Sequence, residues 1–380
     1  MSKKAVIIST FDIYSYNVRT RFVESYLKDK GYDVRVLAAD FDHRHKKKYT
    51  VQREGLELIP VRQYKKNLSL ARILSHRGFA IDSMRVIEKE LPDLLIVGTP
   101  PNYLVKYASK VKRKYRDIKV IFSIGDMWPE TLPVNGKVKK IISPVLYIWK
   151  SLRNNYIKYA DAIIYECDLF KNYLGNVKKE TIEETIYLTK EIQSHAAFDE
   201  FPPIEEGCIF VYTGSLNNIF DVDLTSGILN KTAEIIPVTL HIIGDGENKQ
   251  NFKKTLKNVS VIDHGCIYDE EEKNKIYSKC HFALNLMKTS VFVGLTMKSV
   301  DYFAAGMPVI NNISHDTKRL IEEYDCGFNY DGNNENLLKW IKNLKNEDIV
   351  KMKKNSYMVY KNNFVKDLFN KKMDELFSRM

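Results

Sequence analysis

Short apolar runs recur along the first half of the chain and are separated by segments long enough to form helices. The runs are Ala5–Ser9, Val34–Ala38, Leu94–Val97, Val120–Ser123 and Ala162–Tyr165. Residues 17–30 lie between the first two runs, and Gly31 follows them at a position typical of a helix C-cap. Because parallel strands are joined by crossover helices, this alternation predicts a doubly wound parallel-sheet α/β domain.

A second series of the same kind begins after an interruption near residue 202. Pro202-Pro203 and the acidic Glu205-Glu206-Gly207 break the pattern, so we place a linker at about 190–207. The later runs are Ile209–Tyr212, Val238–Ile243, Val259–Ile262, Phe282–Asn285, Val309–Asn311 and Phe328–Tyr330. The chain is therefore predicted to form two Rossmann-like domains, residues 1–190 and 191–362, which face each other across a cleft. Ligands are expected at the carboxyl ends of the strands.

Composition narrows the class of protein. The chain has 380 residues, of which 44% are hydrophobic and 28% charged, as in a globular protein. Its five cysteines are odd in number and widely spaced, which favours neither a disulfide framework nor a zinc site. We find neither a signal peptide nor a run of about 18 apolar residues, so a cytoplasmic protein is expected.

Positive charge is concentrated in the first half of the chain. The net charge is +11, and residues 1–190 hold 36 Lys and Arg against 21 Asp and Glu. Residues 191–380 hold 23 against 27. A basic half could bind nucleic acid or an anionic membrane surface, and charge alone does not choose between them. We expect no nucleic-acid binding, because the sequence has no zinc module and no interleaved basic and aromatic RNA motif.

The segment 294–310 has the pattern of an anion-binding helix start. Thr296 or Ser299 can cap a helix whose first amides, including that of Met297, point at an anion, and Lys298 adds a positive charge. Asp301 lies three residues later on the same helical face. Amides and a cation suit a diphosphate, and a carboxylate one turn on suits ribose hydroxyls. The alternative is a capped helix with an exposed Lys-Asp pair.

This segment resembles the donor-binding signature of GT-B glycosyltransferases of the retaining family-4 kind, E-A-x-A-x-G-x-P-V-I. Asp301 occupies the carboxylate position, and residues 304–310 match the rest. Two further segments are similar to the family's glycine turns: one holds Gly214 and Ser215, and the other holds Gly244, Asp245 and Gly246. The resemblance implies transfer from a nucleoside-diphosphate sugar, UDP- or GDP-linked, with retention and without a metal or other cofactor. A subgroup of bacterial surface-polysaccharide enzymes, which use glycan or lipid-linked acceptors, has a similar pattern.

Three positions depart from the family pattern. Val293 stands where many members have a second acidic residue, and Ser215 and Phe220 stand where they have Arg and Lys. Lys298 is the replacement that we expect to bind the phosphates. The alternative is a catalytically degenerate protein that only binds a nucleotide or a partner transferase.

Two loops of the first domain are candidates for acceptor binding. Both follow apolar runs, and they resemble the P-P and D-x-W-P-E segments of the polysaccharide enzymes. Asp126 is expected to bind or deprotonate an acceptor hydroxyl, although a turn or N-cap role is the alternative. Trp128 is expected to form a wall for a sugar ring, or else to anchor its loop. The other candidate acceptor residues are Pro101, Asn102, Asn17 and Arg19.

The segment Lys137–Ala160 has apolar residues at helical spacing with lysines around them. This pattern fits a helix on an anionic membrane, or else an ordinary core helix with a basic face. With the charge asymmetry, it leads us to expect a peripheral protein at the inner face of the cell membrane. Two D-x-D sequences, at Asp40 and Asp221, are not expected to bind metal. The family also implies that the final helix, 363–380, packs back on the first domain.

Overall fold

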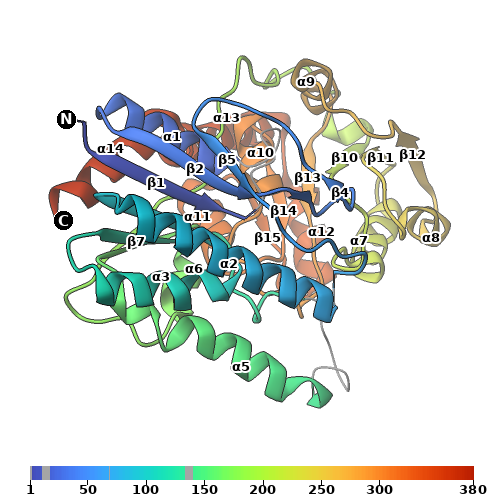
Figure 1. The fold of residues 1–380 in the computed structure, drawn as a ribbon. Coiled ribbons are helices and arrows are strands. Elements are labelled where there is room, and N and C mark those ends of the chain that lie inside the picture. Colours follow the sequence, from blue (N-terminus) through green and yellow to red (C-terminus); the bar gives the residue numbers. More distant parts are fainter. Residues whose placement is uncertain (1, 11–17, 68, 133–139) are drawn as a thin grey trace. The chain divides into compact units, whose positions relative to one another are not determined.

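The computed structural model describes residues 2–10, 18–67, 69–132 and 140–380. It divides the chain into two compact units. The first unit consists of Met1–Thr189 together with Lys366–Met380, and the second consists of Lys190–Val365. Each is a parallel sheet with helices on its faces (Figure 1).

Among the described residues, the first unit contains a seven-stranded sheet in the order β5-β2-β1-β6-β7-β8-β9. Its strands are all parallel: β1 (Lys4–Ser9), β2 (Asp33–Ala39), β5 (Leu56–Ile59), β6 (Leu94–Thr99), β7 (Lys119–Ile124), β8 (Ala162–Tyr165) and β9 (Ile182–Thr185). A short antiparallel hairpin follows β2 and consists of β3 (Phe41–Asp42) and β4 (Lys47–Lys48). The apolar runs of the sequence form the buried middle strands, as a parallel sheet covered on both faces requires.

The final helix, α14 (Lys366–Ser378), completes the core of the first unit. The other helices in the described residues of this unit are α1 (Val18–Asp29), α2 (Leu70–Glu90), α3 (Asn102–Lys114), α5 (Ser143–Asn154), α6 (Asp168–Tyr173) and the short 3₁₀ helix η1 (Ile157–Tyr159). Phe369, Met373 and Leu376 of α14 are buried in the same cluster as Ile7 of β1 and Phe22 of α1. Figure 1 shows α14 beside α1, at the opposite end of the sequence.

The second unit contains, in its described residues, a six-stranded parallel sheet in the order β12-β11-β10-β13-β14-β15. The strands are β10 (Cys208–Thr213), β11 (Val238–Ile243), β12 (Val259–Asp263), β13 (Phe282–Asn285), β14 (Val309–Asn311) and β15 (Gly327–Asn329). The helices are η2 (Ile204–Glu206), α7 (Val222–Ala233), α8 (Lys249–Thr255), α9 (Glu270–Ser278), α10 (Met297–Ala304), α11 (Asp316–Tyr324), α12 (Asn334–Asn343) and α13 (Asn346–Asn363).

Strand order reverses beside the first strand of each sheet. In the first unit β1 lies between β2 and β6, and in the second unit β10 lies between β11 and β13. Connections therefore leave the first strand in opposite directions, which opens a crevice at its carboxyl end. These two edges are where functional side chains are expected, and both predicted sets of loops lie there.

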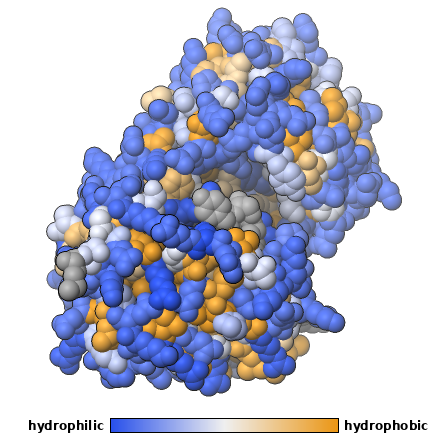
Figure 2. Space-filling model, turned by 45° about the horizontal axis from the view of Figure 1, so that its top comes forward, coloured by the Kyte–Doolittle hydropathy of each residue, from blue (hydrophilic) through white to orange (hydrophobic). Residues whose placement is uncertain are grey.

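The predicted basic helix ends before its sequence pattern does. Residues 133–139 lie outside the described residues; beyond them, α5 covers Ser143–Asn154 and ends before η1. Within the described residues, no helix has the length and apolar character needed to cross a membrane. On the face shown in Figure 2, hydrophilic residues predominate and hydrophobic ones are interspersed among them.

Candidate functional site

The glycine turns of the second unit meet at the carboxyl edge of its sheet. β10 and β11 pair in parallel with Thr213 opposite Ile243, so Gly214 and Gly244 are neighbours. The Gly214 amide donates to the Ile243 carbonyl at 2.8 Å. A Cβ added to Gly244, whose φ is +147°, would lie 2.0 Å from the Gly214 carbonyl oxygen. Gly244 therefore has no room for a side chain, and Gly214 has a φ of +126°, a backbone conformation that favours glycine.

Helix α10 begins beside these turns and is fixed at its start by polar side chains. Thr296 is the N-cap, and its hydroxyl accepts a hydrogen bond from the Ser299 amide at 3.0 Å. Ser299 is fully buried, and its hydroxyl accepts from Asn285 of β13 at 2.9 Å. Met297 is exposed. The first turn of a helix keeps amides without intrahelical partners, so this start can receive an anion.

The ammonium group of Lys298 lies against the first glycine turn. Its Nζ donates to the Tyr212 hydroxyl at 3.0 Å and lies 4.1 Å from the centre of the Tyr212 ring. A Cβ at Gly214 would lie 3.2 Å from Lys298 Cε. Burial lowers the pKa of Lys298 to about 7. The site therefore holds a cation of limited solvation, and no carboxylate bonds to it in the described residues.

Asp301, one turn later, faces a different set of groups. Its carboxylate accepts from Lys190 at 2.7 Å, and Lys190 also pairs with Glu270 at 2.8 Å. Burial acts to lower the pKa of Lys190, but the two carboxylates outweigh it and raise that pKa. Asp301, Lys190 and Glu270 share a small pocket of the second unit with Tyr277. Thus Lys298 and the glycine turns come together, while Asp301 is held by an ion pair.

The remaining candidate donor residues, Ser215 and Asp245, take part in hydrogen bonds within the glycine turns. The Ser215 carbonyl accepts from the Tyr212 hydroxyl at 2.9 Å, so Tyr212 connects this turn to Lys298. Asp245 accepts from the Gly246 amide at 2.8 Å through its side chain. Its carbonyl accepts from Leu216 at 3.0 Å. These contacts fix the backbone at the strand ends.

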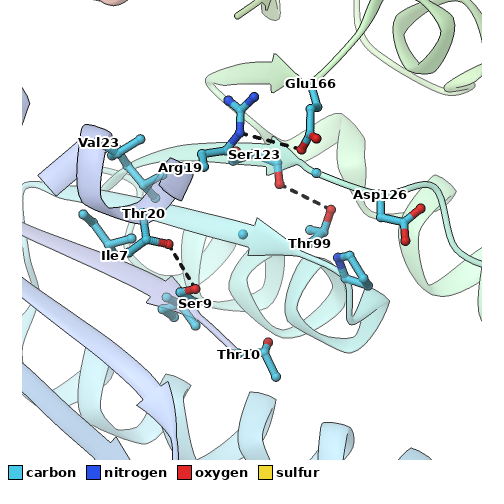
Figure 3. A pocket seen from close by; sticks show the side chains of 15 residues that line it. Ile7, Ser9, Thr10, Arg19, Thr20, Val23, Thr99, Ser123, Asp126 and Glu166 are labelled. Carbon is cyan, nitrogen blue, oxygen red and sulfur yellow. Dashed lines mark hydrogen bonds and ion pairs between the residues drawn. The ribbon is translucent and has the colours of Figure 1, made fainter. Parts of the chain in front are cut away.

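A polar pocket of about 220 Å³ lies at the corresponding edge of the first unit. It is formed where β1, β6, β7 and β8 end side by side. Hydroxyl groups, two carboxylates and one guanidinium line it, and Figure 3 shows them: Ser9, Thr10, Thr20, Thr99, Ser123, Arg19, Asp126 and Glu166. This mixture of donors and acceptors suits a ligand that carries several hydroxyl groups.

Arg19 and Glu166 lie next to each other in the lining of this pocket (Figure 3). Arg19 Nε lies 3.9 Å from Glu166 Oε2, and Arg19 Nη2 donates to the Ile186 carbonyl at 2.7 Å. Burial raises the pKa of Glu166 to about 7, because the opposing effect of Arg19 is smaller and the charge of Asp126 adds to the rise. Arg19 was a predicted acceptor residue, and the structure places it in the pocket.

Asp126 lines the same pocket but also holds its own loop. Its carboxylate accepts from the Met127 amide and from Trp128 Nε1, both at 2.8 Å. Burial raises the pKa of Asp126, and these hydrogen bonds oppose the rise. The turn role that the sequence analysis kept as an alternative is therefore present in the structure. A role toward an acceptor stays a prediction.

Three other candidate acceptor residues lie in the interior of the first unit. Asn102 is fully buried and donates to the carbonyls of Trp128 and Trp149 at 2.8 and 2.9 Å. Trp128 is only 8% exposed and stacks on His76. Pro101 is buried and precedes α3. Their contacts support an anchoring role and give no support to sugar contact. Asn17 lies outside the described residues.

One aspartate of each D-x-D sequence has a local partner. Asp221 is the N-cap of α7 and accepts from the Leu224 amide at 3.0 Å. Asp42 accepts from the Arg44 and His45 amides and from the His45 ring. Each therefore has a structural function in its own loop.

Sequence reasoning missed three residues at these edges. Glu166 directly follows β8, in the same position relative to its strand as the loops that were selected, so its placement could have been found. Tyr212 belongs to an apolar run that predicts a strand, and the local sequence gives no sign of its contact with Lys298. Lys190 lies 111 positions from Asp301, and local sequence carries no signal for that pair.

Comparisons with known proteins agree with this geometry. Residues 207–346 match the family described as glycosyl transferases group 1. The chain is 24% identical over 323 residues to a chitobiosyldiphosphodolichol beta-mannosyltransferase of Debaryomyces hansenii, a match that covers 75% of this chain and 68% of that protein.

Solved structures show the same fold at low identity. Sucrose-phosphate synthase from Thermosynechococcus elongatus superposes with a TM-score of 0.71 at 12% identity, over 99% of this chain and 98% of that one. HepE of Anabaena in complex with UDP gives 0.66 at 13% identity over all of both chains. The lipopolysaccharide outer core galactosyltransferase WaaB also gives 0.66, at 14% identity and full coverage of both.

The parallel sheets of the two units confirm the predicted α/β architecture. The solved structures share it across nearly their whole length, and the family match covers the glycine turns and α10 of the second unit. Together these findings identify the chain as a glycosyltransferase of the GT-B fold.

Proposed function

We propose that this glycosyltransferase moves a sugar from a nucleoside-diphosphate sugar, UDP- or GDP-linked, to a glycan or lipid-linked acceptor. The observation that carries the proposal is the position of Lys298, whose ammonium lies beside Gly214 and one residue into the N-terminus of α10. Glycine turns let a ligand approach the backbone, and the helix start and the lysine together favour a diphosphate.

The same groups would assist bond cleavage. Negative charge builds on the leaving phosphate as the bond to the sugar breaks, and positive groups fixed in advance stabilise that charge more in the transition state than in the ground state. Lys298 is fixed by its contact with Tyr212. This is the support for our proposal that the reaction needs no metal ion. Retention of configuration is proposed on the family resemblance.

The acceptor is proposed to bind in the polar pocket of the first unit. Arg19 offers N–H donors there, and Asp126 and Glu166 offer acceptors. A carboxylate that is close to half ionised near neutral pH can take the proton of an attacking hydroxyl. Glu166 has that property, since its pKa is about 7.

A role in surface polysaccharide or glycoconjugate synthesis is proposed at the inner face of the cell membrane. WaaB is named for transfer to lipopolysaccharide, and the Debaryomyces relative is named for a diphosphodolichol-linked substrate. Helix α5 and the residues before it expose Ile141, Val145, Tyr147 and Ile148 in the basic half of the chain. Exposed apolar side chains among lysines support peripheral binding to an anionic membrane.

A thermal-shift screen of nucleotide-sugars tests the donor proposal. We expect a UDP- or GDP-sugar to raise the melting temperature of the unchanged protein, and Lys298→Ala to abolish most of this rise. Lys253→Ala is the control, because Lys253 belongs to the same unit and pairs with Asp263 on the surface. A stabilising donor whose effect survives Lys298→Ala would refute the phosphate assignment.

The second candidate function is binding without catalysis. Phe220 favours it, since it is buried against Tyr212 and Phe252 and supplies no cation where related enzymes have one. Release of free sugar or transfer to an acceptor by the purified protein, lost in Lys298→Ala, would exclude this candidate. Tight donor binding without any turnover would favour it.

A further inference from the structure

A second hollow of the first unit lies between the start of α2 and helix α5. It has a volume of about 140 Å³ and shares no lining residue with the polar pocket. Its walls are mostly apolar: Ile73, Leu132, Ile142, Val145, Leu146 and Trp149. Leu70 and Ile148, on the same two helices, are 70% and 61% exposed. We call this hollow the α2/α5 groove.

Three polar residues of the α2/α5 groove, one of them cationic, come from the start of α2 and the residues just before it. They are Asn67, Ser69 and Arg72. Arg72 is 7% exposed, and its guanidinium lies 4.4 Å from the Trp128 ring and donates to the Asn67 carbonyl at 3.0 Å. The cation is thus held at the groove by an aromatic face and a backbone carbonyl, and neither neutralises its charge.

The β3–β4 hairpin brings further positive charge to these polar residues. Lys46 Nζ contacts Asn67 Oδ1 and lies 4.9 Å from the centre of the Tyr64 ring, and Arg72 lies 5.7 Å from the same ring. Burial lowers the pKa of Lys46, and the positive charge of Arg72 lowers it further. The two cations therefore repel each other across a partly buried site.

The nearby carboxylates already have other partners. Asp42 lies in electrostatic reach of Lys46, and its oxygens accept from Arg44 and His45. Asp126 lies in reach of Arg72, and its oxygens accept from Met127 and Trp128. These carboxylates do not cancel the repulsion between Arg72 and Lys46, and an external anion would reduce it.

We propose that the α2/α5 groove binds an anionic lipid, with its apolar chain between the two helices and its phosphate group at Arg72 and Lys46. A mostly apolar hollow that is lined by Arg72, with Lys46 in contact with its lining residue Asn67, matches an amphiphile that carries a phosphate at one end. A peptide would leave backbone groups without partners along the apolar walls. The inference rests on the proposed membrane association and is independent of the donor site.

Trp149 provides a direct readout, because it lines the groove. The chain has three tryptophans, and Trp340→Phe removes the one in the second unit. We expect vesicles of phosphatidylglycerol with brominated acyl chains to quench the remaining fluorescence strongly. Brominated phosphatidylcholine should quench it several-fold less, because it lacks a net negative headgroup. Inorganic phosphate alone should leave the fluorescence unchanged.

Matched variants separate the groove from the general surface. Val145→Asn places a polar group in the groove, and we expect it to reduce quenching several-fold. Val51→Asn is the control, since Val51 is 48% exposed and Val145 is 51% exposed. Lys46→Ala should weaken binding to anionic vesicles several-fold, whereas Lys178→Ala, a lysine that pairs with Glu180 elsewhere on the unit, should not.

Different outcomes would overturn different proposals. Equal quenching by both brominated lipids, or full quenching in Val145→Asn, would refute the lipid site. Binding to anionic vesicles without quenching would leave peripheral association in place and also refute the groove. If a variant fails to fold, the comparison of the two brominated lipids on the protein that keeps Val145 and Lys46 still tests the proposal. Donor binding, measured separately by thermal shift, is not affected by any of these results.

Discussion

A lysine half-buried beside an aromatic ring is costly to keep charged, and Lys298 shows the consequence. Desolvation disfavours the ammonium form, so its pKa falls to about 7. A bound diphosphate would reverse that effect by supplying the missing negative charge. Donor binding and protonation of Lys298 are therefore expected to be coupled.

The first prediction follows from that coupling. The affinity for UDP-glucose should fall as pH rises through about 7, by about tenfold between pH 6 and pH 8, because the charged fraction of Lys298 falls by that factor. Isothermal titration calorimetry at several pH values measures it. Lys298→Arg keeps its charge throughout this range and should remove the pH dependence. A wild-type affinity that is constant over this range would contradict the prediction.

The pKa of Glu166 is shifted upward, opposite to that of Lys298, and the shift can be tested by measuring stability at two pH values. Its ordinary pKa of 4.5 rises to about 7 in the folded protein. The folded state thus binds the proton more tightly than the unfolded state does. Glu166 therefore contributes to the free energy of unfolding in full below pH 4.5, and this contribution is lost as pH rises through 7. Glu166→Gln should be more stable than the wild type at pH 8, by up to about 3 kcal/mol, and equally stable near pH 4.

Urea unfolding of both proteins at the two pH values tests this second prediction. Glu54→Gln, at an exposed turn of the same unit, is the control and should change stability little at either pH. A Glu166→Gln variant that is less stable than the wild type at pH 8 would show that the charged carboxylate is stabilised by Arg19 more than it is destabilised by burial.

At the residue scale, sequence reasoning found groups that follow strands and missed groups whose partners are distant. Lys298 and the glycines could be selected because turns and helix starts have local patterns. Asn102 and Trp128 were selected by the same logic, but burial depends on neighbours such as Trp149, 47 positions away from Asn102. No local pattern contains that information.

At the scale of elements, helix α10 depends on the residue at its start. Thr296→Ala should reduce the free energy of unfolding by about 1 kcal/mol, because the Ser299 amide loses its cap. It should also weaken donor binding, since the first turn would fray. Asn333→Ala removes the N-cap of α12, where Asn333 accepts from the Glu335 amide at 2.8 Å.

The two cap variants together form the third prediction. Denaturant unfolding should give similar losses for both, whereas calorimetry with UDP-glucose should show weaker binding for Thr296→Ala alone. If Asn333→Ala weakened donor binding as much, the effect would come from general destabilisation of the second unit and not from the helix start.

Strands were easier to predict than helix limits. The apolar runs of both series correspond to strands because a parallel sheet buries both of its faces and leaves a continuous apolar signal. Amphipathic segments extend past their helices: the pattern of 137–160 continues through η1, where Ile157 is buried although α5 has already ended. Periodicity records which side chains are buried and does not record where helical hydrogen bonding stops.

At the scale of the whole molecule, both ends of the chain belong to the first unit. α14 returns to the first unit and buries Met373 and Leu376 completely in its core. Composition and periodicity show only that such a helix is amphipathic, and family resemblance was needed to say where it packs. The first unit is consequently built from both ends of the chain, and the second from its middle.

The fourth prediction concerns this arrangement. A protein that ends at Val365 lacks three buried apolar side chains of the first unit, Phe369, Met373 and Leu376. Each such loss costs about 2–5 kcal/mol, so together they are comparable to the whole stability of an ordinary domain. We expect the first unit of this truncated protein to be rapidly cleaved in limited proteolysis, while residues 190–365 resist it and still bind UDP-glucose. Leu376→Ala should lower stability by about 2–5 kcal/mol, and Met358→Ala, at a position 46% exposed in the second unit, should have little effect. Protease resistance of both units after truncation would mean that α14 adds little to the core, and loss of donor binding would mean that the second unit cannot fold without the first.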